Sequence, residues 1–415
     1  MSSWLHVVAE ALQLCRHLNT SLVEPCVAPD GKLSCYGGIA PPRMLLRPPW
    51  LALGEIIDLR RLAAHFGVPV TPARTFWRDK ARLTLRGGIA LCLQGPPFSN
   101  FCAGKARQVP LLPRGPITSA YPWKPEALAQ AAQGRAVVVV VYMARNGLAI
   151  SERRAAHAAL RTLRYTADMW QRAALLAQRL RGGGSTGAPL LSASAVTDKN
   201  IRSWVEQSWP RYTAVQWRHE GSSVSATSCA RTMLQLADGW GCTKGAPCVL
   251  VSDIMGSAAP RHRSHQGGFG QGAQLVSEKM ALRALLSSRR FVKAEMVLAK
   301  AGDWAAISTA PGPGGTALLN SSSATLLAVV DKLLAAAATN LVTCHESCGA
   351  ASTCAPCCRG PWDVARAKGG GVAGAVVAPS LIVREVVAMR RRLGDGTGRW
   401  TQLCWSTNGS RAANG

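Results

Sequence analysis

The amino-acid sequence predicts an α/β protein with largely parallel sheets, and three observations carry this prediction. Segments with helical periodicity alternate with short apolar runs along the chain. The run Arg135–Tyr142 is β-branched and uninterrupted, as is typical of parallel strands buried on both faces. Two further apolar runs, 212–215 and 249–253, end in polar residues. Ligands in open α/β sheets bind beyond the carboxyl ends of strands, so these ends are candidate sites.

The length of the chain favours more than one domain. At roughly 100–200 residues per domain, 415 residues correspond to two or more. The segment 181–187 has the Gly- and Ser-rich composition of a flexible linker. We therefore expect an N-terminal domain at 1–150, a connecting helix and linker at 151–199, and a C-terminal domain at 200–415.

The N-terminal half begins with a predicted helix over Trp4–Leu18, where apolar residues recur at three- and four-residue spacing. Ser21–Val23 follows as a short strand. A helix feeding a strand is the second half of a βαβ unit, so the first strand of this domain is expected to be missing. The sequence then predicts a helix at 53–62, an irregular region at 81–124 and one long helix at 151–180.

The C-terminal half repeats the alternation. Apolar runs predict strands at 212–215, 249–253 and 341–343. Helical periodicity predicts the intervening helices, at 201–208, 229–239, 277–286, 325–338 and 381–392.

The formal charge of +26, from 48 Lys and Arg against 22 Asp and Glu, indicates an anionic partner such as a nucleotide, a nucleic acid or a membrane surface. The basic residues are scattered, and the densest clusters are Arg390–Arg392 and Arg261–Arg263. No basic block is interleaved with aromatic residues, so we expect a solvated basic surface and no nucleic-acid partner. No apolar run reaches the ~18 residues of a membrane span, and no signal peptide or membrane anchor is expected in this sequence.

The 14 cysteines are many for a reducing compartment and are compatible with a secretory one. Asn19, Asn320 and Asn408 are potential N-glycosylation acceptors. The Cys-rich loop at 344–358 contains pairs spaced loosely like zinc ligands, but disulfides are the favoured interpretation, with zinc and free thiols as alternatives.

The most suggestive polar cluster follows the predicted strand at 212–215: Gln216, Arg218, His219 and Glu220. A guanidinium offers a planar fork of donors that suits a phosphate group. The cluster therefore predicts a nucleotide-phosphate site with Arg218 as the main cation. The competing interpretation is a solvated surface arginine.

Several segments together resemble the GDP-fucose O-fucosyltransferase-like family of glycosyltransferases, particularly divergent plant and algal members. The opening Glu10–Pro25 looks like the family's first helix and second strand, and Trp50–Leu62 is similar to the segment that follows there. Leu160–Tyr165 lies in a predicted helix like the one that leads to the family's second domain. The stretch Val215–Glu220 resembles the family's His-x-Arg-x-Glu motif, with Gln216 in place of the histidine. Val249–Asp253 and Leu326–Val342 resemble segments near the donor site.

The resemblance implies a GT-B-like fold, in which two Rossmann-like domains face a cleft. It implies inverting, metal-independent transfer of fucose from GDP-fucose to a protein or glycan hydroxyl in the Golgi lumen, with no cofactor. Arg218 would hold the diphosphate, and Gln216, Ser252 and Asp253 would contact the nucleotide. Glu220 and Glu10 are candidates for activating the acceptor hydroxyl. For Glu10, which lies on an amphipathic helix, a salt-bridged surface carboxylate is the default interpretation.

Two departures from the family pattern keep alternatives open. Gln216 can form hydrogen bonds but cannot act as an acid, and the family's Gly-rich turn before the first helix is absent. A catalytically inactive binding protein of the same fold is therefore the first alternative. A basic zinc- or nucleic-acid-binding protein is the second.

Overall fold

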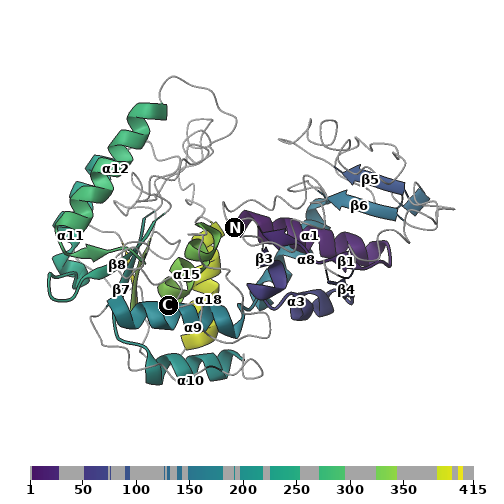
Figure 1. The fold of residues 1–415 in the computed structure, drawn as a ribbon, viewed down its shortest axis with the longest axis horizontal. Helices are drawn as coiled ribbons and strands as arrows, with labels where there is room; N and C mark the ends of the chain where they lie inside the picture. The colour runs from purple at the N-terminus through teal and green to yellow at the C-terminus, as the bar shows by residue number, and fades with distance from the viewer. Residues whose placement is uncertain are drawn as a thin grey trace. The chain divides into compact units, whose positions relative to one another are not determined.

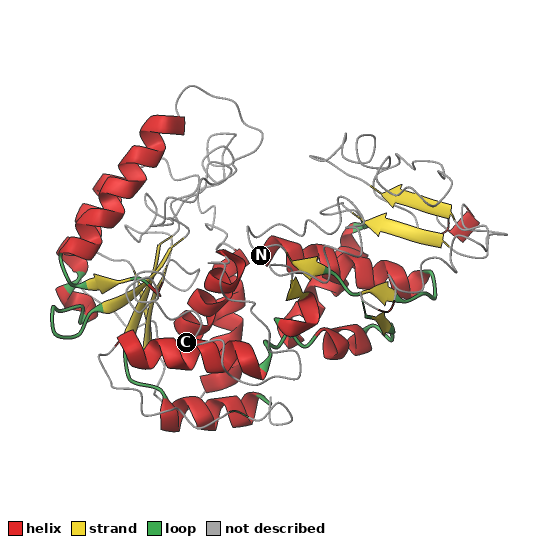
Figure 2. Cartoon of the chain, in the orientation of Figure 1, coloured by secondary structure: helices red, strands yellow, loops and turns green. Residues whose placement is uncertain are grey.

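The fold is described from a computed structural model. The described residues are 2–27, 51–72, 75, 89–93, 126, 129–130, 138–142, 148–180, 191, 197–217, 225–252, 271–294, 324–343, 381–394 and 401–404. The chain divides into two compact units: Met1–Met169 with Ala305–Leu326, and Trp170–Trp304 with Leu327–Gly415. Helices and mostly parallel strands form both units, which confirms the α/β prediction (Figures 1 and 2).

The first unit begins with helix α1 (Ser2–His17), whose apolar face is buried at Leu5, Val8 and Leu12. The helix closes at Asn19, where a φ of 47° places the backbone in the left-handed region that ends many helices and that Asn tolerates. Strand β1 (Leu22–Val23) follows and pairs in parallel with β4 (Val70–Thr71). Strands β2 (Cys26–Val27) and β3 (Leu51–Ala52) form a separate antiparallel pair.

The prediction of one continuous helix at 53–62 is wrong. The structure has a short 3-10 helix, η2 (Leu53–Glu55), and then α3 (Leu59–His65). Asp58 separates them, because its carboxylate accepts the backbone N–H of Arg61 at 3.0 Å and caps the new helix. Aspartate is a preferred N-cap residue, so this position begins a helix rather than continuing one.

The predicted single helix at 151–180 is also two elements, and the cause is tertiary. Helix α8 (Ile150–Ala159) ends in the 3-10 turn η4 (Leu160–Thr162), and α9 (Ala167–Leu180) begins five residues later. Between them, Tyr165 forms a bridge with Ile57. The backbone N–H and the hydroxyl of Thr166 donate to the carbonyls of Ile56 and Glu55 at 3.1 and 2.9 Å. These bonds replace the intrahelical ones.

The strand expected at Arg135–Tyr142 is present as β6 (Val138–Tyr142). Its parallel partner is β5 (Ile89–Leu93), with Ile89 opposite Val138. The partner lies inside the region predicted to be irregular, where the surrounding Pro and Gly residues mask a five-residue apolar run.

The second unit contains a five-stranded sheet in which every neighbouring pair is parallel, in the order β11-β10-β7-β8-β9. The strands are β7 (Thr213–Trp217), β8 (Cys248–Ser252), β9 (Phe291–Val292), β10 (Asn340–Thr343) and β11 (Thr401–Cys404). The chain moves outward from β7 through β8 to β9, then returns to the other side of β7 for β10 and β11. The direction of winding therefore reverses between β7 and β10.

Helices cover both faces of this sheet. They are α10 (Asp198–Ser208), α11 (Ala226–Leu236), α12 (Gln271–Ser287), α15 (Ala324–Ala337) and α18 (Leu381–Gly394). Figure 1 shows α11 and α12 on one side of the strands and α15 and α18 on the other. Val215 and Trp217 of β7 lie in one buried cluster with Met233 of α11 and Leu285 of α12. Because side chains alternate along a strand, Gln216 faces the side of α15 and α18.

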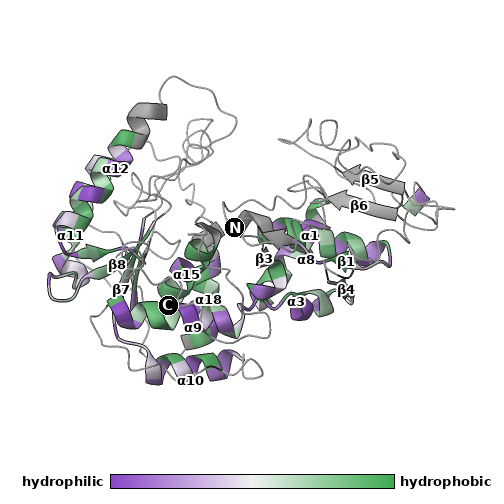
Figure 3. Cartoon of the chain, viewed as in Figure 1, coloured by the Kyte–Doolittle hydropathy of each residue, from purple (hydrophilic) through white to green (hydrophobic). Residues whose placement is uncertain are grey.

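Helix α15 is predominantly hydrophobic (Figure 3) and is buried along most of its length. Its last carbonyls are capped by Arg390 of α18, which donates to the carbonyl oxygens of Ala335, Ala336, Ala338 and Thr339. Arg390 is 7% exposed, so the prediction that the 390–392 cluster is solvated is wrong at this position. Burial lowers the pKa of Arg390 to about 10, while the nearby Tyr212 acts in the opposite direction, and the guanidinium stays charged at neutral pH.

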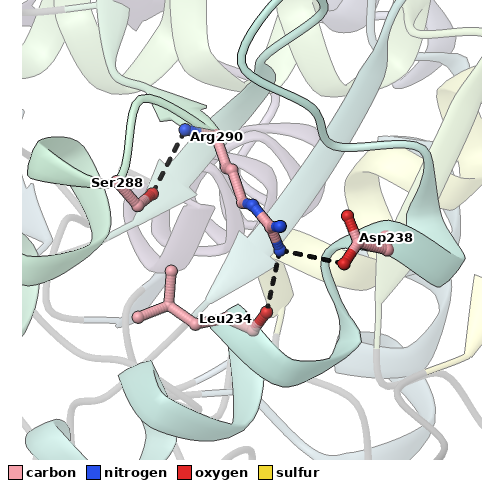
Figure 4. Close-up of polar contacts among 4 residues, drawn as sticks. All are labelled: Leu234, Asp238, Ser288 and Arg290. Atoms are coloured by element: carbon pink, nitrogen blue, oxygen red, sulfur yellow. Dashed lines mark hydrogen bonds and ion pairs between the residues drawn. The ribbon is translucent and has the colours of Figure 1, made fainter.

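Two short links stabilise the opposite side of the sheet. Arg290, which precedes β9, donates from Nη1 to the carbonyl of Leu234 at 3.3 Å and to Asp238 Oδ2 at 3.1 Å, and its backbone N–H bonds Ser288 Oγ (Figure 4). A disulfide joins Cys242 to Cys248, the first residue of β8. Both links fix the turns that lead into the strands.

We expect Arg390→Leu to lower the free energy of unfolding by about 2–3 kcal/mol, because hydrogen bonds from a charged donor to the buried carbonyls of α15 are lost. Urea unfolding measures this. Arg391→Leu is the matched control, since Arg391 is exposed on the same helix, and its effect should stay within about 0.5 kcal/mol. Equal effects of the two substitutions would contradict the capping role.

Cys15 of α1 is expected to resist alkylation in the folded protein. Burial disfavours the thiolate and raises the pKa of Cys15 to about 12. The reactive form is therefore scarce at every pH below that value, and the rate should begin to rise only as the pH approaches it. Iodoacetamide labelling mapped by peptide mass spectrometry at pH 8 measures the rate, with urea-unfolded protein as the control. Equal labelling of Cys15 in both states would contradict this assignment.

Candidate functional site

The carboxyl edge of the five-stranded sheet gathers polar residues from three neighbouring strands. In the parallel register, Trp217 at the end of β7 lies opposite Ser252 at the end of β8. On the other side of β7, Val215 lies opposite Val342, so Gln216 and Thr343 are at the same level. Gln216, Ser252 and Thr343 thus share one edge, at the point where the winding reverses. Such switch points are where open α/β sheets bind ligands.

Gln216 is not in a polar segment after the strand, as predicted, but inside it. Strand β7 extends to Trp217, two residues beyond the predicted end at Val215, and every one of its residues is buried. The extension follows from pairing with β8 through Gln216 and Trp217. An amide at this depth needs hydrogen-bond partners.

Thr343 of β10 supplies one such partner. Its Oγ1 donates to Gln216 Oε1 at 3.2 Å, and the two residues are 0% and 5% exposed. The bond engages the amide oxygen of Gln216, so the amide nitrogen Nε2, which is a hydrogen-bond donor, points in a different direction from Thr343. The arrangement fixes the orientation of a neutral donor at the edge of the sheet.

Among the other predicted site residues, Ser252 is half-buried at the last position of β8. Trp217 leads directly into Arg218, and Ser252 directly into Asp253. Arg218, His219, Glu220 and Asp253 lie outside the described residues. The same holds for the linker at 181–187, the cluster 261–263, Asn320, the Cys-rich loop 344–358 and Asn408.

Sequence reasoning did not predict that Thr343 lies at this edge or that Lys293 is buried. Thr343 reads as the last residue of an apolar strand, and only the strand order reveals that it lies beside Gln216. Lys293 follows the two-residue strand β9 and is 2% exposed. The sequence shows only a lysine directly after two apolar residues, and lysines in such positions are usually exposed, so its burial could not be predicted.

The first unit contains a second polar cluster, between α1 and α8. Glu10 is 0% exposed, and its Oε1 lies 2.9 Å from Nε2 of His157. The default interpretation of Glu10 as a surface carboxylate is therefore wrong: it lies on the buried face of α1 and is paired with a residue of α8. A helical periodicity cannot reveal this, because the partner is 147 positions away in the sequence.

Within the part of the chain that the structure describes, no group of three His, Cys, Asp or Glu side chains is arranged to hold a metal ion. No helix in the described ranges has the length and apolar character needed to cross a membrane.

Comparisons with known proteins give no assignment for this chain. No protein-family model matches it, and a search of curated proteins finds no significant match.

We expect Thr343→Val to lower the free energy of unfolding by about 1–3 kcal/mol, because it removes the donor to Gln216 Oε1 and leaves a buried acceptor unpaired. Thr343→Ser keeps the hydroxyl and should recover most of this loss. Chemical unfolding of the two variants beside the wild type measures the difference. If Val and Ser are equally tolerated, the hydrogen bond does not stabilise the edge.

Proposed function

We propose that this chain is a glycosyltransferase of the O-fucosyltransferase-like type, which transfers fucose from GDP-fucose to a protein or glycan hydroxyl. The observation that carries the proposal is the coincidence of three features at one place. The winding of the sheet reverses between β7 and β10. Gln216 and Thr343 are joined there by a hydrogen bond. Arg218, the predicted phosphate ligand, follows β7 directly.

The strand order supports a nucleotide-binding role for the second unit. Counted in chain order from β7, the strands lie in the order 3-2-1-4-5, which is the order of the Rossmann-type nucleotide-binding sheet. In this proposal the second unit is the Rossmann-like donor domain. The first unit, with its parallel pairs β1–β4 and β5–β6, is the acceptor domain of a GT-B-like protein.

The residue types suit the chemistry. When GDP leaves, negative charge develops on its phosphate oxygens, and a preorganised guanidinium stabilises that charge without a metal ion. Arg218 would supply this group, and Glu220 would take part in activating the acceptor. Ser252 and Asp253 would contact the nucleotide from the end of β8. Gln216 carries no charge, so it would orient the donor through hydrogen bonds of its amide group.

The disulfide between Cys242 and Cys248 supports an oxidising compartment for the protein, in keeping with a Golgi location. It does not bear on the choice of donor.

A catalytically inactive binding protein of the same fold is the second candidate, and Gln216 favours it. The position carries a histidine in the family motif, but here the amide oxygen is engaged with Thr343 and the side chain cannot transfer a proton. This candidate binds the nucleotide sugar but does not release GDP. Measuring GDP release from GDP-fucose in the presence of acceptor glycoproteins separates the two.

Calorimetry of the full chain with GDP and GDP-fucose tests the donor assignment. We expect Arg218→Glu to weaken binding by about 100-fold or more, because charge-assisted hydrogen bonds to the diphosphate are replaced by repulsion. Arg211→Glu is the matched control, since Arg211 is exposed before the amino end of β7 and should leave affinity within about twofold. Absence of binding to the folded wild type, or equal affinity of the Arg218 variant, would sink the assignment.

A further inference from the structure

A stripe of polar side chains runs along α1 where it meets α8. His6, Glu10, Gln13 and His17 recur at four-, three- and four-residue spacing, which places them on one face of the helix. The face meets α8 through three contacts: His6 and Glu10 both lie beside His157, and His17 lies beside Glu152. Glu152, near the start of α8, lies beside His17 at the end of α1, whereas His157, later in α8, lies beside Glu10. The two helices are therefore antiparallel.

The two histidine–carboxylate pairs of this stripe differ in burial. His17 Nε2 lies 2.8 Å from Glu152 Oε1, and the side chains are 32% and 24% exposed. Such solvated pairs contribute little to stability. Glu10 is 0% exposed while its partner His157 is 27% exposed. Burying a carboxylate is costly even when it is paired, and an apolar pair of similar volume is often at least as stable. Packing alone therefore gives no reason for a glutamate at this position.

The contact with Glu10 selects one tautomer of the His157 ring when the carboxylate is ionised. An ionised carboxylate only accepts hydrogen bonds, so a neutral His157 ring paired with it holds its proton on Nε2. In the neutral ring the lone pair is then on Nδ1. The ring of His6 packs edge-on against His157, with centroids 4.3 Å apart and an interplanar angle of 85°, which restricts its rotation. A carboxylate that holds one ring nitrogen while the other accepts a proton is the arrangement of a general base.

We propose that Glu10 and His157 form a general-base dyad in the first unit, acting on a hydroxyl group of a bound ligand. The hydroxyl O–H bond breaks, the proton passes to Nδ1 of His157, and the electron pair stays on the oxygen, which becomes the nucleophile. Glu10 is a positioning residue: it holds the Nε2 proton and stabilises the imidazolium that forms. The imidazolium returns its proton to water. That the ligand is the acceptor of the transferase rests on the proposed function, whereas the dyad rests on its own geometry.

The dyad reverses the role expected of Glu10 from sequence. A carboxylate that is wholly buried cannot reach a ligand, and the partly exposed group of the pair is His157. The proton is therefore accepted by His157, while Glu10 acts through it.

Carbethoxylation by diethyl pyrocarbonate, mapped by peptide mass spectrometry on the full chain, tests the dyad without a substrate. The reagent captures the imidazole lone pair, so we expect His157 of the wild type to react. Glu10→Gln should slow that reaction, because the ring loses the charged acceptor that holds its Nε2 proton and makes Nδ1 more basic. Glu152→Gln is the matched control on the same helix pair and should leave the His157 rate within about twofold. An unreactive His157 in the wild type, or an unchanged rate in Glu10→Gln, overturns the dyad.

Transfer assays separate a failed dyad from a failed donor assignment. We expect His157→Asn to keep the wild-type affinity for GDP-fucose and to lower kcat for transfer by about 100-fold or more. Glu10→Gln should lower kcat with little change in KM, and His17→Asn should change neither. Transfer by His157→Asn at the wild-type rate overturns the dyad as a base for the acceptor. If the wild type does not bind GDP-fucose, the proposed function fails, and the carbethoxylation result alone decides the dyad.

Discussion

The pairing of β7 with two parallel neighbours is the constraint on which the second unit depends. Its five residues are all buried, and the strand is hydrogen-bonded to β8 on one side and β10 on the other. Side chains join β7 to β10 at both ends: Asn340 Nδ2 donates to Thr213 Oγ1 at 3.2 Å, and Thr343 donates to Gln216. A slip of one residue would move Gln216 to the face now occupied by Trp217, so the register also fixes the polar edge.

The polar contacts of α15 show how a nearly all-apolar helix is held in one position. Apolar packing is non-directional, but Tyr212 Oη donates to the carbonyl of Leu334 at 2.7 Å. Lys332 Nζ lies 2.6 Å from Glu385 Oε2 of α18. With the guanidinium of Arg390 at the helix end, these directional contacts determine how far α15 and α18 can slide against the sheet. Since Gln216 faces these helices, they also shape the side of the edge on which its amide lies.

The sequence predicts the elements whose signal is local. The apolar periodicity of α15 and the β-branched run of β6 need no distant partner to be recognised. The break at Tyr165–Thr166 cannot be predicted locally, because it arises from a hydrogen bond between segments more than 100 positions apart. The cap at Asp58 is a local signal, three residues from the N–H that it accepts, and the apolar periodicity that continues across it obscures it. The same reason explains the site: Gln216 was identified from its motif, but Thr343 and His157 become relevant only through strand order and helix packing.

The order of the strands also has a consequence for synthesis on the ribosome. Thr343, the partner of Gln216, lies 127 positions downstream of it. When β7, β8 and β9 have emerged, one edge of β7 is still unpaired, and it remains so until α15 and β10 have been translated. An exposed apolar strand edge can pair with other chains, and such long-range closure is slow. The nascent chain therefore passes through a stage in which one edge of its central strand is unpaired until β10 is available.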